Sequence, residues 1–200
     1  MILTSRTPLR ISLFGGGTDY PEYFHRAPGA VIGFAIDKYI YISALPLGAF
    51  VDYRFRISYS RVETVDEIGR IEHPVVRTVL SEENHTVPTD FSIQADLPAS
   101  AGLGSSSAFT VGFQKLVWAL KGIDRSPAEL AARAIHIEQS LLGERVGVQD
   151  QMHAAHGGFN RFDFSATANR ISPMGLSAPD LEEISRWMVL VYTGRKRHAS

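Results

Sequence analysis

The chain has 200 residues, of which 44% are hydrophobic and 20% are charged, as is ordinary for a globular protein with a buried core. A net charge of −1 gives no basic footprint for nucleic acid, and the absence of cysteine excludes disulfides, thiolate nucleophiles and cysteine-ligated metals. The N-terminus does not resemble a signal peptide and no apolar run is long enough to cross a bilayer, so we expect a cytoplasmic protein without membrane partners.

The first half of the chain predicts mainly strands. Alternating or β-branched runs occupy residues 8–14, 30–36, 38–45, 53–59 and 90–96. A glycine triplet follows the first of these runs and cannot continue it. Residues 74–83 predict a short helix that has Pro74 in its first turn.

The second half predicts paired helices. One begins near Ser105 and ends near Gly122, with an apolar stripe along one face. Another begins at a Ser126-Pro127 cap, and a short helical piece covers 149–155. Strand-like runs follow at 158–164 and 187–193. Strands followed by paired helices predict an α+β fold with a mixed sheet packed against helices.

A turn rich in glycine and serine, residues 97–108, joins the strand at 90–96 to the helix that begins near Ser105. Small residues let a ligand approach the backbone, and the N-terminus of a helix attracts phosphate. The turn lacks the Gly-Lys-Ser/Thr of a Walker A loop, and Ala108 stands where a nucleophile elbow has its last glycine. The alternative is a purely structural turn in which Ser105 caps the helix.

Two carboxylates stand out. Glu138 falls on the apolar stripe of its helix, where a carboxylate is costly unless it is paired or binds a metal. It is either a Mg²⁺ ligand, helped by a hydroxyl such as that of Ser106, or half of a core salt bridge to Arg133 or Arg145. Asp150 begins a helix, a position that favours an ionised carboxylate and therefore a proton acceptor, but also suits a simple cap.

Histidines at 153 and 156 have a metal-capable spacing, but no third neutral ligand is evident. We therefore interpret them as packing or surface residues.

Three segments in this order, residues 8–20, 98–108 and 147–151, resemble the GHMP kinase superfamily, which includes galactokinase, homoserine kinase and mevalonate kinase. Residues 15–23 and 157–162, with Tyr192-Thr193-Gly194, look most like the D-glycero-D-manno-heptose 7-phosphate kinases within it. Galactokinases carry Glu and His where this chain has Gly16 and Gly17, which argues against galactose as the substrate.

The resemblance implies a fold and a domain organisation. Residues 1–200 would form the ATP-binding N-terminal domain, which is ribosomal protein S5 domain 2-like. The family also has a C-terminal domain with a third, glycine-rich motif that closes over the nucleotide and the substrate. The chain stops before that motif, so we expect it to be a truncated or N-terminal part of a longer protein.

The resemblance also implies site residues. Asp150 would accept or orient the proton of the attacking sugar hydroxyl, and Arg10 would lie near the transferred phosphoryl group. Ser106 and Glu138 would bind Mg²⁺. The ATP phosphates would lie against the residues of the serine turn, namely Pro98, Ala101, Gly102, Leu103, Gly104, Ser105, Ser106 and Ser107. The sugar would lie against Gly16, Gly17, Thr18, Asp19 and Arg161.

The reaction implied is ATP- and Mg²⁺-dependent transfer of the γ-phosphoryl group to the anomeric hydroxyl of D-glycero-D-manno-heptose 7-phosphate, a step in making nucleotide-activated heptose. A substrate that is already phosphorylated needs a second anionic pocket, for which Arg161 and Lys38 are candidates. The resemblance leaves a homodimer possible.

Other functions stay open at this point. The chain could be a kinase for another sugar such as fucose or galactose, or a non-catalytic regulator that binds sugar or nucleotide. A serine hydrolase would use Ser106, Asp150 and His153 in that chain order. RNA binding would need a basic patch with aromatic residues, and the near-neutral charge offers none.

Overall fold

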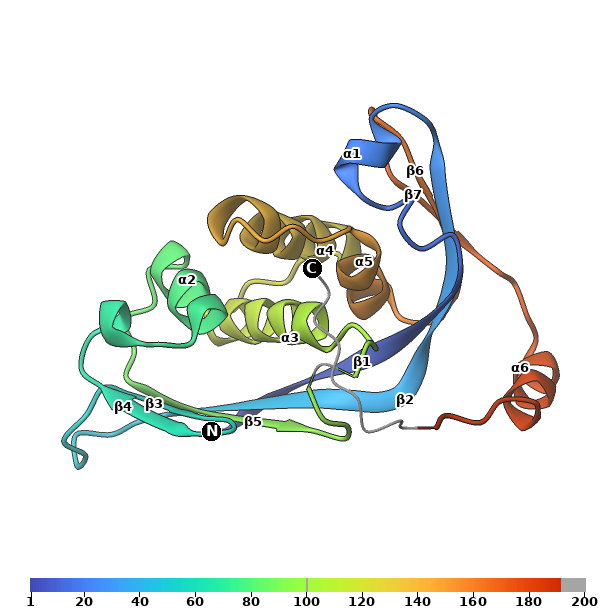
Figure 1. The fold of residues 1–200 in the computed structure, drawn as a ribbon. Coiled ribbons are helices and arrows are strands. Elements are labelled where there is room, and N and C mark those ends of the chain that lie inside the picture. Colours follow the sequence, from blue (N-terminus) through green and yellow to red (C-terminus); the bar gives the residue numbers. More distant parts are fainter. Residues whose placement is uncertain (100, 192–200) are drawn as a thin grey trace.

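The fold is organised around the long strand β2 (Gly29–Pro46) of a computed structural model that describes residues 1–99 and 101–191. Strand β1 (Leu3–Phe14) runs antiparallel along one edge of β2. On the other edge, β2 pairs with β6 (Phe159–Phe164) over its first part and with β5 (Thr89–Ala95) over its last part. The two ends of β2 therefore belong to two wings of one bent sheet (Figure 1).

A bulge lies at the bend of β2. Pro8 faces Tyr39 across the ladder and Arg10 faces Ala35, so Leu9 stands opposite the three residues 36–38. Extra residues on one strand bend it and increase its twist. The two strands predicted at 30–36 and 38–45 are therefore one strand, which continues through the bulge.

Short strands extend the sheet on both sides. Strand β3 (Phe55–Ser58) lies between β5 and β4 (Val62–Val65), and β7 (Arg170–Pro173) lies outside β6. The pairing of β3 with β5 is parallel, whereas the other pairs in the sheet are antiparallel.

The helices cover one face of the sheet (Figure 1). They are α2 (Pro74–Glu82), α3 (Ser105–Leu120), α4 (Pro127–Ile135) and α5 (Gln149–His156). A short 3-10 turn (Ile68–Arg70) precedes α2, and α1 (Pro21–Phe24) lies between β1 and β2. The predicted α+β architecture is confirmed.

Two apolar clusters hold these layers together. In the larger one, Phe91 of β5 packs against Phe113 of α3, with ring centroids 5.1 Å apart. The smaller cluster joins Val31 and Phe162 of the sheet to Met152 of α5. The first turn of α5 is thereby fixed against the bent part of the sheet.

Helix α4 begins with a complete capping box, in which Ser126 and Glu129 satisfy each other's backbone N–H groups. It continues without a break into a π-helical turn (His136–Leu141), which is here called the π-turn. Such turns are frequent at functional sites. Glu138 lies in this π-turn.

The strand predicted at 187–193 is wrong for its described part. Residues 187–191 form no strand, and residues 192–193 lie outside the described residues. Helix α6 (Ala178–Arg186) precedes them, begun by a second capping box between Ser177 and Asp180. The predicted elements do not include this helix, although its Ser-x-x-Asp signal is local; an apolar run becomes a strand only where a partner strand is in reach. No helix within the two described ranges is long and apolar enough to span a membrane.

Candidate active site

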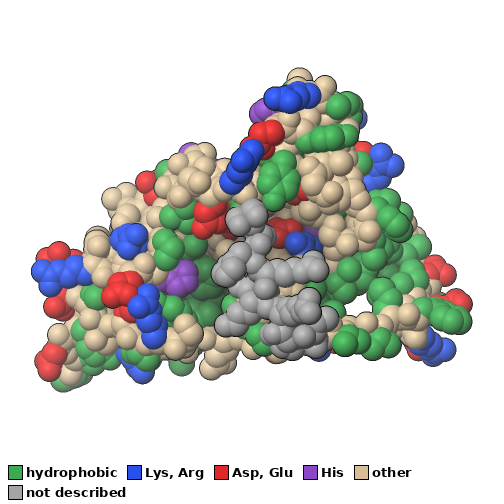
Figure 2. Space-filling view, in the orientation of Figure 1, with side chains coloured by type: hydrophobic (Ala, Val, Ile, Leu, Met, Phe, Trp, Pro, Cys, Tyr) green, Lys and Arg blue, Asp and Glu red, His purple; other side chains and the backbone are tan. Residues whose placement is uncertain are grey.

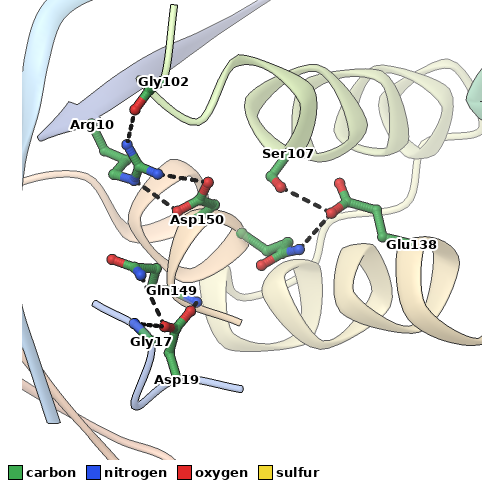
Figure 3. Close-up of polar contacts among 9 residues, drawn as sticks. Arg10, Gly17, Asp19, Gly102, Ser107, Glu138, Gln149 and Asp150 are labelled. Carbon is green, nitrogen blue, oxygen red and sulfur yellow. Dashed lines mark hydrogen bonds and ion pairs between the residues drawn. The ribbon is translucent and has the colours of Figure 1, made fainter. Parts of the chain in front are cut away.

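An ion pair between Arg10 and Asp150 lies at the centre of the candidate site (Figure 3). Strand β1 supplies Arg10 and the first turn of α5 supplies Asp150. The guanidinium binds both carboxylate oxygens, with Nε–Oδ1 at 2.7 Å and Nη2–Oδ2 at 2.8 Å. Both side chains are mostly buried, and a two-point pair of this kind fixes direction as well as distance.

The serine turn lies directly against this pair. Arg10 donates through Nη1 to the carbonyl of Gly102 at 2.9 Å, and its backbone N–H donates to the carbonyl of Leu103 at 3.1 Å. A methyl group on Gly104 would lie 3.2 Å from both Arg10 Cγ and Asp150 Oδ2. Only glycine gives the backbone this close approach to the pair.

The N-terminus of α3 has no side-chain cap, because Gly104 occupies the N-cap position with φ +72°. The alternative in which Ser105 caps the helix is therefore wrong. The first N–H groups of α3 keep their hydrogen-bonding capacity and lie at the positive end of the helix dipole. This arrangement can bind phosphate beside the Arg10–Asp150 pair.

The Glu138 carboxylate is buried between α3, the π-turn and α5, with only 1% of the residue exposed. Ser107 Oγ donates to its Oε2 at 2.9 Å, and Gln151 Nε2 donates to the same oxygen at 2.5 Å (Figure 3). The other oxygen, Oε1, is buried and has no hydrogen-bond partner in the described structure. Burial raises the pKa of Glu138 to about 7.

The core salt bridge that sequence reasoning left open for Glu138 does not form. Arg133 binds Glu82 and Glu83, each at 3.4 Å, and Arg145 binds Glu22 at 3.2 Å. A buried carboxylate without a cationic partner is costly. Its unpartnered oxygen is the observation that fits a cation at this position.

The donor set around Glu138 fits Mg²⁺. One carboxylate and nearby hydroxyls leave most coordination positions to water and phosphate, as Mg²⁺ prefers. Across residues 1–99 and 101–191, no group of three or more His, Asp or Glu residues forms an all-protein metal site. The serine in contact with Glu138 is Ser107, whereas Ser106 is exposed, so the metal role of Ser106 stays a prediction.

Asp19 joins the glycine loop (residues 15–19) to the start of α5. Its carboxylate accepts from Gly17 N at 3.1 Å, from Gln149 N at 3.2 Å and from Gln149 Nε2 at 3.0 Å. Its carbonyl accepts from Val148 N at 3.1 Å, and a methyl group on Gly147 would lie 1.9 Å from Oδ2. With 1% of Asp19 exposed, its carboxylate holds two segments of chain together, and sugar binding stays a prediction.

The remaining predicted sugar residues divide between two places. Thr18 donates to the carbonyls of Gly15 and Ala30, which fixes the glycine loop against β2. The Arg161 guanidinium binds both carboxylate oxygens of Asp163 on the same strand, at 2.7–3.1 Å. The contacts of Arg161 therefore do not connect it to the Arg10–Asp150 pair.

His153 is completely buried, and neither ring nitrogen has a hydrogen-bond partner among the described residues. Its ring stands edge-on to Phe162, with centroids 4.5 Å apart, and burial lowers its pKa to about 3. The interpretation of His153 as a packing residue is confirmed. A hydrolase triad of Ser106, Asp150 and His153 is excluded by this geometry, because Asp150 binds Arg10 and His153 binds neither partner.

A protein-family model matches the middle part of the chain. Residues 70–158 match the family model described as GHMP kinases N terminal domain. This range contains the serine turn, Glu138 and Asp150. This part of the chain is therefore similar to the N-terminal domain of GHMP kinases.

Two sugar kinases are among the relatives whose sequences are similar to this chain. Over 98% of its length the chain is 28% identical to a D-glycero-alpha-D-manno-heptose 7-phosphate kinase from Campylobacter jejuni, of which it covers 61%. Over 76% of its length it is 29% identical to a galactokinase from Chloroflexus aurantiacus, of which it covers 40%. The chain thus spans about two fifths to three fifths of the length of these relatives.

Solved structures share the fold. A crystal structure of a D-glycero-D-manno-heptose 1-phosphate kinase from Bacteroides thetaiotaomicron superposes with a TM-score of 0.81 at 23% identity. The match covers 92% of this chain and 63% of the other. A Lactococcus lactis galactokinase complexed with galactose follows with a TM-score of 0.65 at 17% identity.

Proposed function

We propose that the protein is an ATP-dependent sugar kinase of the GHMP type, of which residues 1–200 provide the ATP-binding part. The observation that carries this proposal is that the Arg10–Asp150 pair lies against Gly104, the N-cap residue of α3. A carboxylate and a guanidinium are thereby held where a bound phosphate would meet an incoming hydroxyl.

Each group has a task in phosphoryl transfer, which depends mostly on positioning and on charge stabilisation. The N–H groups of α3 and the serine turn bind the phosphates of ATP. Asp150 orients the sugar hydroxyl and accepts its proton, and Arg10 stabilises the charge on the transferred group. Glu138 and the adjacent hydroxyls would hold Mg²⁺, which neutralises charge on the phosphates when bound.

The acceptor that fits best is a heptose phosphate. Support comes from the heptose 7-phosphate kinase similar over nearly the whole chain, and from Gly16 and Gly17, which stand where galactokinases have Glu and His. For D-glycero-D-manno-heptose 7-phosphate, the attacked group would be the anomeric hydroxyl. The galactokinase relatives make galactose the necessary comparison substrate.

The test is transfer of the γ-phosphoryl group by the protein expressed from its complete reading frame. We expect transfer to heptose 7-phosphate with ATP and Mg²⁺, and a loss of at least about 100-fold in kcat for Asp150→Asn. The matched control is Asp66→Asn, which changes an exposed carboxylate far from α5 in sequence and leaves the rate unchanged. Full activity of folded Asp150→Asn would contradict the role of Asp150, and transfer to galactose alone would contradict the heptose assignment.

A further inference from the structure

A hollow of about 450 Å³ opens beside the glycine loop, lined by Gly17, Tyr20, Glu22, Tyr23 and Arg145. It adjoins the candidate site because Gly17 shares Asp19 with Gln149, the neighbour of Asp150 (Figure 3). The pKa of Tyr20, which also lines the hollow, is raised. Burial is the largest cause, the carboxylates of Asp19 and Asp150 raise it further, and Arg145 lowers it. The Tyr20 hydroxyl therefore stays protonated and can donate a hydrogen bond to a ligand in the hollow that Tyr20 lines.

Arg145 is aimed into this hollow by the loop that joins the π-turn to α5. Gln139 Nε2 donates to the carbonyl of Val146 at 2.7 Å, and Gly147 packs directly on the Asp19 carboxylate. The two residues that follow Arg145 are thus anchored. The Arg145 side chain itself is 82% exposed and contacts Glu22 at 3.2 Å.

The charged side chains that line the hollow are one guanidinium, Arg145, and one carboxylate, Glu22. Glu22 is the acidic residue that lines the hollow, and its own backbone N–H, followed by Arg145 and Arg26, holds the pKa of its carboxyl below the usual value. An exposed ion pair such as Arg145–Glu22 contributes little stability, so a doubly charged ligand can displace Glu22 from Arg145.

We propose that Arg145, with the hydroxyls of Tyr20 and Tyr23, binds the phosphate that the sugar acceptor already carries. This inference rests on the proposed function and names the group of the substrate that the hollow recognises. A guanidinium offers paired donors that match a phosphate monoester, and the two tyrosines add neutral donors. Glu22 acts as an exchangeable counterion that holds Arg145 when no substrate is bound.

The two other cations considered for this role have ion pairs of their own, as Arg145 does, and differ from it in their position. Arg161 forms a two-oxygen pair with Asp163, and Lys38 contacts its neighbour Asp37 at 3.3 Å. Neither lines the hollow. Arg145 is the cation that shares a cavity with the glycine loop.

The test is calorimetric binding of three ligands to the full-length protein: D-glycero-D-manno-heptose 7-phosphate, the unphosphorylated heptose, and ATP with Mg²⁺. We expect Arg145→Met to weaken binding of the sugar phosphate about 10- to 100-fold and to leave the other two within about threefold. The matched control is Arg70→Met, which removes another exposed arginine of a surface ion pair and changes none of the three.

A second variant moves the affinity in the opposite direction. Glu22→Gln frees Arg145 from its counterion, so we expect the sugar phosphate to bind about three- to tenfold more tightly. A loss of folding cannot produce that gain. Weaker binding of the sugar phosphate by Glu22→Gln, or equal losses for both sugars in Arg145→Met, would overturn the proposal.

The binding readout also separates this proposal from the proposed function. Loss of ATP affinity in Arg145→Met would show that the phosphate at Arg145 belongs to the nucleotide and would overturn the acceptor subsite. Discrimination for the sugar phosphate that depends on Arg145, without any turnover, would support the subsite and contradict the kinase. Turnover of the sugar phosphate that is unchanged in Arg145→Met would support the kinase and contradict the subsite.

Discussion

At the scale of single residues, the charge of Glu138 on an apolar helix face predicts a buried carboxylate that needs a partner. Its position on an apolar stripe predicts burial, and it is buried with one unpartnered oxygen. Sequence reasoning left open a salt bridge to Arg133 or Arg145, and both arginines bind other carboxylates. The charge pattern therefore predicts the burial of Glu138, whereas the choice of its partners depends on tertiary contacts.

We expect Glu138→Gln to stabilise the ligand-free protein at alkaline pH. The folded-state pKa of about 7 lies above the ordinary value of 4.5, so the folded state loses stability as pH rises through this window. Gln keeps the shape without the buried charge, and we expect a gain of up to about 3 kcal/mol at pH 8 that shrinks toward zero at pH 4. Urea denaturation in EDTA measures it.

A second experiment measures how Mg²⁺ changes thermal stability through Glu138. Wild-type protein with ATP should gain thermal stability from Mg²⁺, and Glu138→Gln should lose most of that gain. Glu183→Gln, at an exposed position of α6, serves as the control and should show neither effect. Destabilisation of ligand-free Glu138→Gln at pH 8 would contradict the account of Glu138 as a costly buried charge.

At the scale of elements, the serine turn and α3 act as one unit. The glycines and the helix dipole predict a phosphate site from sequence alone. The helix begins at Ser105 as predicted, but its N-cap residue is Gly104 and not Ser105, and Ser107 lies on the inner face toward Glu138. Helix phase decides which serine faces inward, and a shift of one residue rotates a side chain by about 100°.

We expect Gly104→Ala to impair the site beyond its backbone strain. Gly104 and Gly122 have similar positive φ values, +72° and +69°, so both Ala variants carry a similar conformational cost of about 1 kcal/mol. Only at Gly104 does the added methyl group approach Arg10 and Asp150. We expect kcat to fall at least about tenfold for Gly104→Ala and to stay unchanged for Gly122→Ala, as measured in the phosphoryl-transfer assay.

Equal kinetics of the two variants would show that the turn does not position the pair. Comparable urea midpoints for the two variants would confirm that strain alone does not explain a kinetic difference.

At the scale of the whole molecule, the site exists only where distant segments meet. Arg10 and Asp150 are 140 positions apart in the chain, and Asp19 and Gln149 are 130 apart. The packing of α5 on β2 and β6 brings these groups together, and His153 lies within that packing. The stability of the assembled site therefore depends on a buried neutral histidine.

We expect His153→Leu to reduce the acid sensitivity of the protein. Burial, with Arg10 and His156 nearby, lowers the folded-state pKa to about 3 from 6.5, so stability falls as pH drops through that window. Each pH unit in this window costs about 1.4 kcal/mol of unfolding free energy, and His153→Leu should remove this dependence on pH. Denaturation midpoints between pH 7 and pH 4 measure it, with the exposed His25→Leu as the control. An unchanged slope in His153→Leu would contradict a neutral buried imidazole.

The sequence by itself determined the α+β class, the turn rich in glycine and serine, the helix that follows it and the buried position of Glu138. These features depend on local backbone geometry, capping and hydrophobic period, which neighbouring residues encode. Only the tertiary structure decided that Arg10 binds Asp150, that Ser107 contacts Glu138, that Asp19 joins two loops and that Arg145 lines a hollow beside them. Those contacts depend on the bend of β2 and on the docking of α5, which no local pattern specifies.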